Sequence, residues 1–133
     1  MAERSFSPEE VEALIPALTR VMEGLMRAQA EAVQARQALH AEQQRLTLSG
    51  GGVLDQRAWA EARGHLEREG KRIERGIEEV TKLGGVIKDL GIGLVDFPHL
   101  REGRVVNLCW KHGETAIRYW HGLDEGYAAR KPL

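Results

Sequence analysis

A seven-residue apolar repeat near the start of the chain limits the possible folds most strongly. Its positions are Val11, Leu18, Leu25, Ala32, Leu39 and Leu46, with Leu14, Val21, Ala28 and Ala35 between them. Apolar residues at this spacing lie along one side of an α-helix and are typical of helices that pair with another helix. We expect one long helix, which Pro16 should kink or divide because proline removes a backbone hydrogen bond.

The start of this helix is marked by capping residues. Ser7 offers a hydroxyl at the N-cap, Pro8 occupies the first helical position, and Glu10 completes a capping box. Phe6 and Val11 are spaced to form a hydrophobic staple across the cap. The sequence therefore predicts that the helix begins at Pro8.

A second helix is predicted from about Asp55 to Leu83, where Gly84 and Gly85 end it. The glycine-rich stretch 49–52 fits a tight reversal between antiparallel helices. A phosphate-binding loop is the alternative, but no Gly-Lys-Ser or Gly-Lys-Thr follows the glycines.

After Gly85 the apolar pattern alternates, as in β-strands. Residues 104–121 are predicted to form a β-hairpin with a two-residue turn at His112-Gly113, and residues 94–97 a third strand that Pro98 ends or places at an edge. The predicted fold is α+β: a long, coiled-coil-like antiparallel helical hairpin over residues 1–85, then a small three-stranded antiparallel sheet and tail over residues 86–133. The two parts are expected to form one continuous folding unit.

The hairpin register decides which side chains can meet. With Lys111 opposite Glu114, Arg104 lies opposite His121, and Cys109 points to the other face of the sheet. Cys109 and His121 then cannot share one tetrahedral centre. We predict no metal site and no cofactor on this ground.

The candidate ligand site consists of Asp96, Arg104, Glu114, His121 and Arg130. Arginine beside histidine suits a carboxylate or phosphate, which a guanidinium can hold with two hydrogen bonds. The alternative is a structural network that ties Asp96 to Arg104 and Glu114 to Arg130, and so fastens the tail to the sheet.

No catalytic residue is predicted. Cys109, in a Leu-Cys-Trp strand, is typical of a small buried hydrophobe rather than a nucleophile activated by histidine. Trp110 and Trp120 are interpreted as core or interface anchors rather than platforms for stacking bases.

The C-terminal third carries a recognisable pattern. It contains Gly93-Leu94-Val95-Asp96-Phe97-Pro98, Leu108-Cys109-Trp110, Gly113-Glu114, Trp120-His121 and Arg130, with Pro132-Leu133 at the end. This pattern resembles the bacterial family catalogued as domain of unknown function 2203, with Tyr127 and Ala129 where phenylalanine and glycine are expected. The resemblance implies no assigned activity.

The seven-residue apolar repeat favours self-association. Two helices whose contact faces are rich in alanine bury little apolar surface against each other. A homodimer or larger assembly would cover the remaining apolar side chains. The expected interface residues are Leu14, Leu18, Val21, Leu25 and Leu39. The alternative is that the β segment folds over the helices within one chain. The leading hypothesis is a non-enzymatic, self-associating interaction or scaffold protein, with a module for small anions as the second hypothesis.

Charge and cysteine content limit the partners and the compartment. The net charge is -1, from 19 basic and 20 acidic residues, so no overall field attracts nucleic acid, and any such contact would be local. No apolar run reaches the roughly 18 residues of a membrane span. One cysteine and no signal-like segment before Phe6 predict a reducing cytoplasm.

Overall fold

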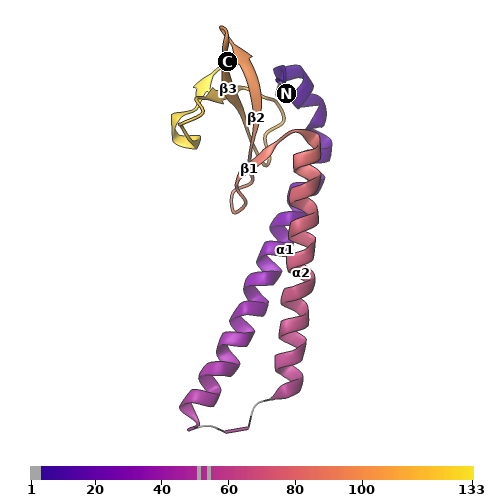
Figure 1. Ribbon diagram of the computed structural model, residues 1–133, viewed down its shortest axis with the longest axis vertical. Helices are drawn as coiled ribbons and strands as arrows, with labels where there is room; N and C mark the ends of the chain where they lie inside the picture. Colours follow the sequence, from indigo (N-terminus) through magenta and orange to yellow (C-terminus); the bar gives the residue numbers. More distant parts are fainter. Residues whose placement is uncertain (1–3, 51, 54) are drawn as a thin grey trace. The chain divides into compact units, whose positions relative to one another are not determined.

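The computed structural model describes residues 4–50, 52–53 and 55–133. Two helices precede an antiparallel sheet, so the predicted α+β class is confirmed (Figure 1). The sheet has five strands rather than the predicted three. Strands β1 (Val86–Asp89) and β5 (Lys131–Pro132) were not predicted, because four and two residues are too few to show alternation.

Helix α1 spans Pro8–Leu48 and begins at the predicted residue. The capping box is present: Ser7 Oγ accepts a hydrogen bond from the Glu10 backbone N–H at 3.1 Å, and Glu10 Oε1 accepts one from the Ser7 N–H at 2.9 Å. Phe6 and Val11 are both buried, as the hydrophobic staple requires.

The helix continues through Pro16, so of the two expected effects of this proline, a kink or a division, the division does not occur. Proline removes one hydrogen bond, but Val11 and Leu18 on either side of it are fully buried. Burying such side chains contributes roughly 1.5–3 kcal/mol each, which offsets the local loss.

Helix α2 spans Gln56–Leu83. Asp55 caps its start, since Asp55 Oδ1 accepts a hydrogen bond from the Ala58 N–H at 3.0 Å. The predicted turn over residues 49–52 joins the two helices, although Gly51 lies outside the described residues.

The end of α2 is a Schellman motif. The Gly84 N–H donates to the Thr81 carbonyl at 3.0 Å, and the Gly85 N–H donates to the Val80 carbonyl at 3.1 Å. Gly84 has a φ of 102°, and a Cβ there would collide with the Phe6 ring. Glycine is therefore required where the chain leaves the helix and enters β1.

Contacts divide the described chain into two compact units, and the division falls inside both helices. One unit is Leu25–Arg75, a helical hairpin in which Glu31 Oε2 and His65 Nε2 are 3.0 Å apart. The other comprises Met1–Gly24 and Gly76–Leu133 and contains the whole sheet. Within the described residues, none of the helices combines the length and the apolar character needed to cross a membrane.

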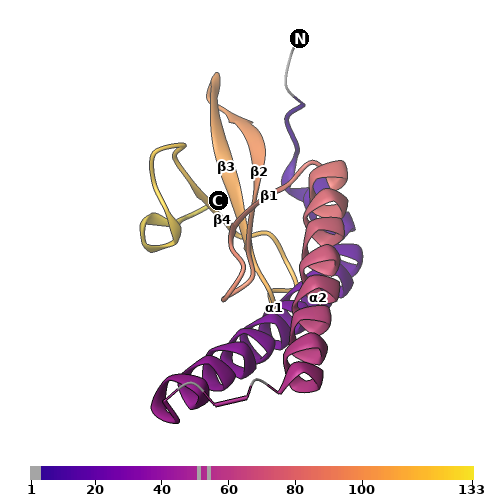
Figure 2. The same cartoon turned by 60° about the horizontal axis from the view of Figure 1, so that its bottom comes forward.

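The strands follow one another across the sheet in chain order, each antiparallel to the next. Figures 1 and 2 show β2 (Leu94–Arg101) and β3 (Arg104–Lys111) as the long central hairpin. Their turn lies at Glu102-Gly103, where both residues have positive φ, at 50° and 79°. The sequence prediction missed this turn.

Pro98 lies inside β2 rather than ending it. The pairing of β1 with β2 begins at Val86 opposite Asp96, so β2 has no β1 neighbour at Pro98. This part of β2 is an edge, where proline is tolerated. The Pro98 carbonyl there accepts a hydrogen bond from the Phe6 N–H at 2.7 Å.

The predicted register of the last hairpin is wrong. The turn at His112-Gly113 is present, because the Glu114 N–H donates to the Lys111 carbonyl at 2.9 Å. Residues 114–118 then leave the strand before β4 (Tyr119–His121) begins. His121 consequently pairs with Asn107, three positions along β3 from the predicted partner Arg104.

This register gives the sheet two different faces. One face is apolar and buried, with Val95 opposite Trp110 and Phe97 opposite Leu108. The other face carries Asp96 opposite Cys109, and Asn107 opposite His121. Successive side chains of a strand point to opposite faces of the sheet. The observed partner of His121 lies three residues from the predicted one, so His121 lies on the face opposite to the predicted face.

Replacing Gly84 with alanine should destabilise the protein. A left-handed conformation costs an L-residue about 1–2 kcal/mol, and displacing the Phe6 ring adds about 1–3 kcal/mol. Gly24→Ala is the matched control, because Gly24 lies inside α1 with no atom within 4 Å of the added Cβ. That control should gain about 1 kcal/mol. Urea unfolding measures both, and equal stability of the two variants would contradict this account of the α2 end.

Candidate functional site

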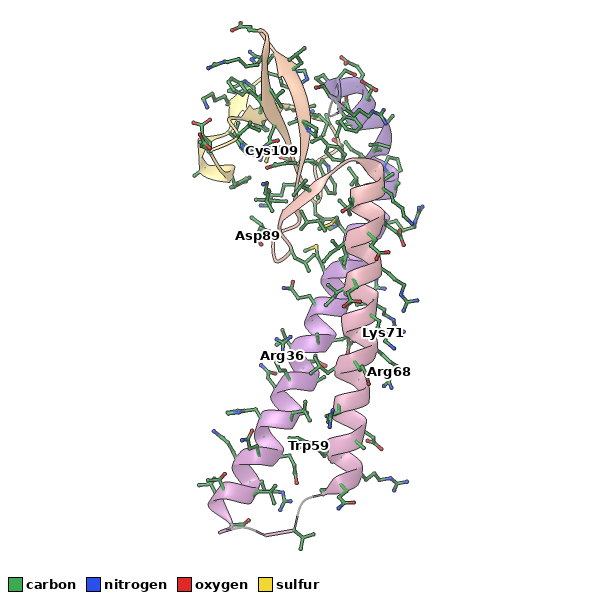
Figure 3. The ribbon with its side chains drawn as sticks, in the orientation of Figure 1. Arg36, Trp59, Arg68, Lys71, Asp89 and Cys109 are labelled. Carbon is green, nitrogen blue, oxygen red and sulfur yellow. The ribbon has the colours of Figure 1, made fainter. Side chains whose placement is uncertain are left out.

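Three buried side chains meet on the polar face of the sheet. Asp96 lies on β2, Cys109 opposite it on β3, and His121 on β4. Each is at most 2% exposed, and one oxygen, the sulfur and one ring nitrogen all lie within 4.8 Å of one another. Figure 3 labels Cys109 among the side chains of the sheet. We call Asp96, Cys109 and His121 the buried cluster.

The hydrogen bonds of His121 fix its orientation. Nδ1 lies 2.8 Å from the Gly122 carbonyl oxygen, which can only accept, so Nδ1 carries a proton. Nε2 lies 3.1 Å from both carboxylate oxygens of Asp96. Two lone pairs at this distance would repel each other, so a proton or a metal ion must lie between Nε2 and the carboxylate.

The Asp96 carboxylate is incompletely satisfied. Oδ1 accepts the hydrogen bond from His121, whereas the buried Oδ2, although also 3.1 Å from Nε2, makes no hydrogen bond among the described residues. An unsatisfied buried polar atom costs about 1–3 kcal/mol, and more for a charged group. This oxygen is therefore available to a cation.

The Cys109 thiol is neutral in the protein without metal. Burial, and next the negative charge of Asp96, raise the pKa of this thiol to about 12. The thiolate is the reactive form of cysteine. His121 has both ring nitrogens engaged, with Asp96 and Gly122, so no free nitrogen remains to activate the thiol.

Arg130 holds the C-terminal tail against the cluster. Its Nη2 lies 2.8 Å from both carboxylate oxygens of Glu114 and donates to the Cys109 carbonyl at 3.2 Å. The guanidinium also lies 4.1 Å from the centre of the Tyr119 ring. The ion pair between Glu114 and Arg130 is the tail-fastening contact that the structural alternative predicted.

The predicted site residues are therefore only partly brought together. Asp96 meets His121, and Glu114 meets Arg130. Arg104 is exposed at the far end of β3, opposite Arg101, and takes no part in the cluster. The predicted pair of Arg104 with His121 is wrong because of the register.

The remaining predicted residues are placed as follows. Trp110 is fully buried in the core, and Trp120 is half-buried with the Arg101 guanidinium 4.8 Å and the Lys131 amine 4.7 Å from its ring. Of the expected interface residues, two are buried within the single chain and three are half-buried: Leu18 and Leu25, then Leu14, Val21 and Leu39.

Sequence reasoning missed Cys109 as a partner of Asp96 and His121. The signal that could have found it is Glu102-Gly103, a two-residue turn between alternating segments. That turn sets Asp96 opposite Cys109. No comparable local signal sets the position of His121, because residues 114–118 are irregular.

Comparison with protein families gives a match that covers residues 4–133. The matching family is described as "Uncharacterized conserved protein (DUF2203)". The chain belongs to this family. The searches of curated proteins and of solved structures each gave no match. This match confirms the predicted resemblance to the family. It assigns no activity, so the function is argued from the buried cluster.

Removing the tail contact should destabilise the fold. Arg130→Ala leaves Glu114 without its ion-pair partner, and a lost hydrogen bond to a charged group costs about 1.5–3 kcal/mol. Arg104→Ala is the matched control: Arg104 is exposed, and such substitutions usually change stability by less than about 0.5 kcal/mol. Urea unfolding of both variants tests this, and a larger loss for Arg104→Ala would contradict the described tail contact.

Proposed function

We propose that the protein binds one divalent transition-metal ion through Asp96, Cys109 and His121. The observation that carries this proposal is the convergence of three buried ligand atoms of three different types within 4.8 Å. A metal site was not predicted from the sequence, because Cys109 and His121 were expected on opposite faces of the sheet. The observed pairing of His121 with Asn107 removes that objection.

The ligand types favour zinc. Thiolate and imidazole ligands select zinc and related transition metals, whereas magnesium and calcium prefer oxygen ligands. Two oxygen or nitrogen ligands of a tetrahedral zinc ion lie about 3.3 Å apart, given bonds of about 2.0–2.1 Å. The distance of 3.1 Å between His121 Nε2 and Asp96 Oδ1 is close to that value.

The surroundings of the cluster also suit a metal ligand. Histidines that bind metals usually donate the other ring N–H to a carbonyl or carboxylate. His121 has this arrangement, because Nδ1 donates to the Gly122 carbonyl and leaves Nε2 toward Asp96 and Cys109. Three protein ligands also leave a fourth position for water or another molecule, as in zinc sites that act on ligands.

A buried ion pair between Asp96 and His121 is the competing explanation. It uses a proton in place of the metal and leaves Cys109 as a core residue. It places the second carboxylate oxygen 3.1 Å from Nε2, but leaves that oxygen without a hydrogen bond among the described residues. The two explanations differ in one measurable property, the affinity of the protein for zinc.

Titration calorimetry with zinc after chelator treatment tests the proposal. We expect one zinc ion per chain in the parent protein, and binding weakened about a hundredfold or more in Cys109→Ala, because one of three ligands is lost. His65→Gln is the matched control, since His65 contacts Glu31 in the other compact unit. That variant should bind zinc as the parent does.

Two results would contradict the proposal. Equal zinc binding by the parent and by Cys109→Ala would place zinc elsewhere, and no binding by the folded parent would leave the ion pair as the explanation. Circular dichroism establishes that each variant is folded before the titration.

We also propose that the protein self-associates through its helices and works in a reducing compartment such as the cytoplasm. Large apolar side chains are exposed in and beside the helical hairpin, namely Val33 at 39%, Leu48 at 87% and Val53 at 88%. A second copy of the chain would cover this surface. The single buried cysteine forms no disulfide, in keeping with a reducing compartment.

Light scattering tests the self-association. We expect the parent to be a dimer or larger at micromolar concentration, and Val33→Lys to lower the mass, because a charge would be buried in the interface. Gln34→Lys, at an exposed neighbouring position, should not lower it. A monomeric parent would contradict this proposal and leave the metal proposal intact.

A further inference from the structure

A pocket of about 620 Å³ borders the buried cluster. Asp96 is the member of the cluster that lines it, with Asn107 beside it on the same face of the sheet. The volume lies within the usual range of small-molecule sites, about 300–1,000 Å³. All of its lining residues belong to the compact unit that contains the sheet.

The lining of this pocket combines apolar and basic residues. Apolar residues form much of the wall: Phe6, Val86, Pro98, Val105 and Leu123. Val86 and Leu123 are 54% and 61% exposed, so this apolar surface is open to solvent. Three basic residues, Arg4, Lys82 and Lys88, also line the pocket.

Two of these three basic residues form no ion pair among the described residues. Arg4 is paired with Glu10 at 3.1 Å, whereas Lys82 and Lys88 have no ion pair among the residues that the structure describes. An apolar wall with two available amines suits a molecule that has an apolar body and a negatively charged group.

Asp96 offers an anion no point of attachment unless a metal is present. In the metal-free protein, the proton between His121 Nε2 and the Asp96 carboxylate balances the charge of that carboxylate. A divalent ion held by Asp96, the Cys109 thiolate and neutral His121 cancels two negative charges and offers a fourth coordination position. Binding of metal and binding of anion should therefore be linked.

We infer that this pocket binds a small apolar carboxylic acid whose carboxylate completes the coordination of the metal at Asp96, Cys109 and His121. The inference rests on the proposed metal site. The apolar body lies against Val86, Val105 and Leu123, and Lys82 and Lys88 attract the acid to the pocket. A single metal ion with one open coordination position favours a monocarboxylate. A polyanion would need further metal ions in the pocket to bind its other charged groups.

Fluorescence titration with 2-naphthoate tests the inference, with the neutral 2-naphthamide as the matched ligand. We expect 2-naphthoate to bind the zinc-loaded protein, and the metal-free protein to bind it at least about tenfold more weakly, since the metal supplies the main contact with the carboxylate. The naphthamide should bind either form weakly. The double variant Lys82→Gln with Lys88→Gln should retain zinc but bind 2-naphthoate about fivefold more weakly.

Lys71→Gln is the control for the lysine variants, because Lys71 lies on α2 in the other compact unit and does not line the pocket. It should bind 2-naphthoate as the parent does. Zinc binding without any zinc-dependent binding of 2-naphthoate would overturn this inference and leave the metal site standing. Equal affinity for naphthoate and naphthamide would also overturn it. Failure to bind zinc would overturn both proposals.

Discussion

The contact between Asp96 and His121 is the interaction on which the candidate site depends. It joins β2 to β4 across β3, with Nε2 3.1 Å from the carboxylate and both residues at most 2% exposed. A buried carboxylate is costly unless a positive charge compensates it. That requirement selects the register in which His121 lies opposite Asn107 and beside Cys109, and so it creates the three-ligand cluster. Arg130 and Glu114 then hold the tail against the same strands.

The helices could be predicted because their signals are local. The capping box of Ser7 and Glu10 and the ending at Gly84-Gly85 involve residues that are adjacent or nearly adjacent in the chain. Whether Pro16 divides the helix could not be predicted, because its effect depends on side chains buried around it rather than on its own backbone. The alternating pattern after Gly85 also identified the sheet, but not the short strands β1 and β5.

The candidate site was harder to predict because it depends on pairing between distant strands. The sequence identified Asp96 and His121 as members of one cluster, and Glu114 with Arg130 as a tail contact, and these contacts are present. It included Arg104 and rejected Cys109 as a metal ligand, since the hairpin was assumed to continue directly after His112-Gly113. The irregular residues 114–118 change the partner of His121 by three positions, and an odd shift exchanges the two faces of the sheet. No propensity within that stretch fixes the length of the irregular segment.

X-ray absorption at the zinc edge tests the central claim most directly, because it identifies the atoms bound to the metal. Our account predicts one sulfur at about 2.3 Å and nitrogen or oxygen ligands at about 2.0–2.2 Å in the zinc-loaded protein. Cys109 is the single cysteine of the chain, so a sulfur at that distance assigns the ion to the buried cluster. A spectrum with nitrogen and oxygen neighbours and no sulfur would contradict the account.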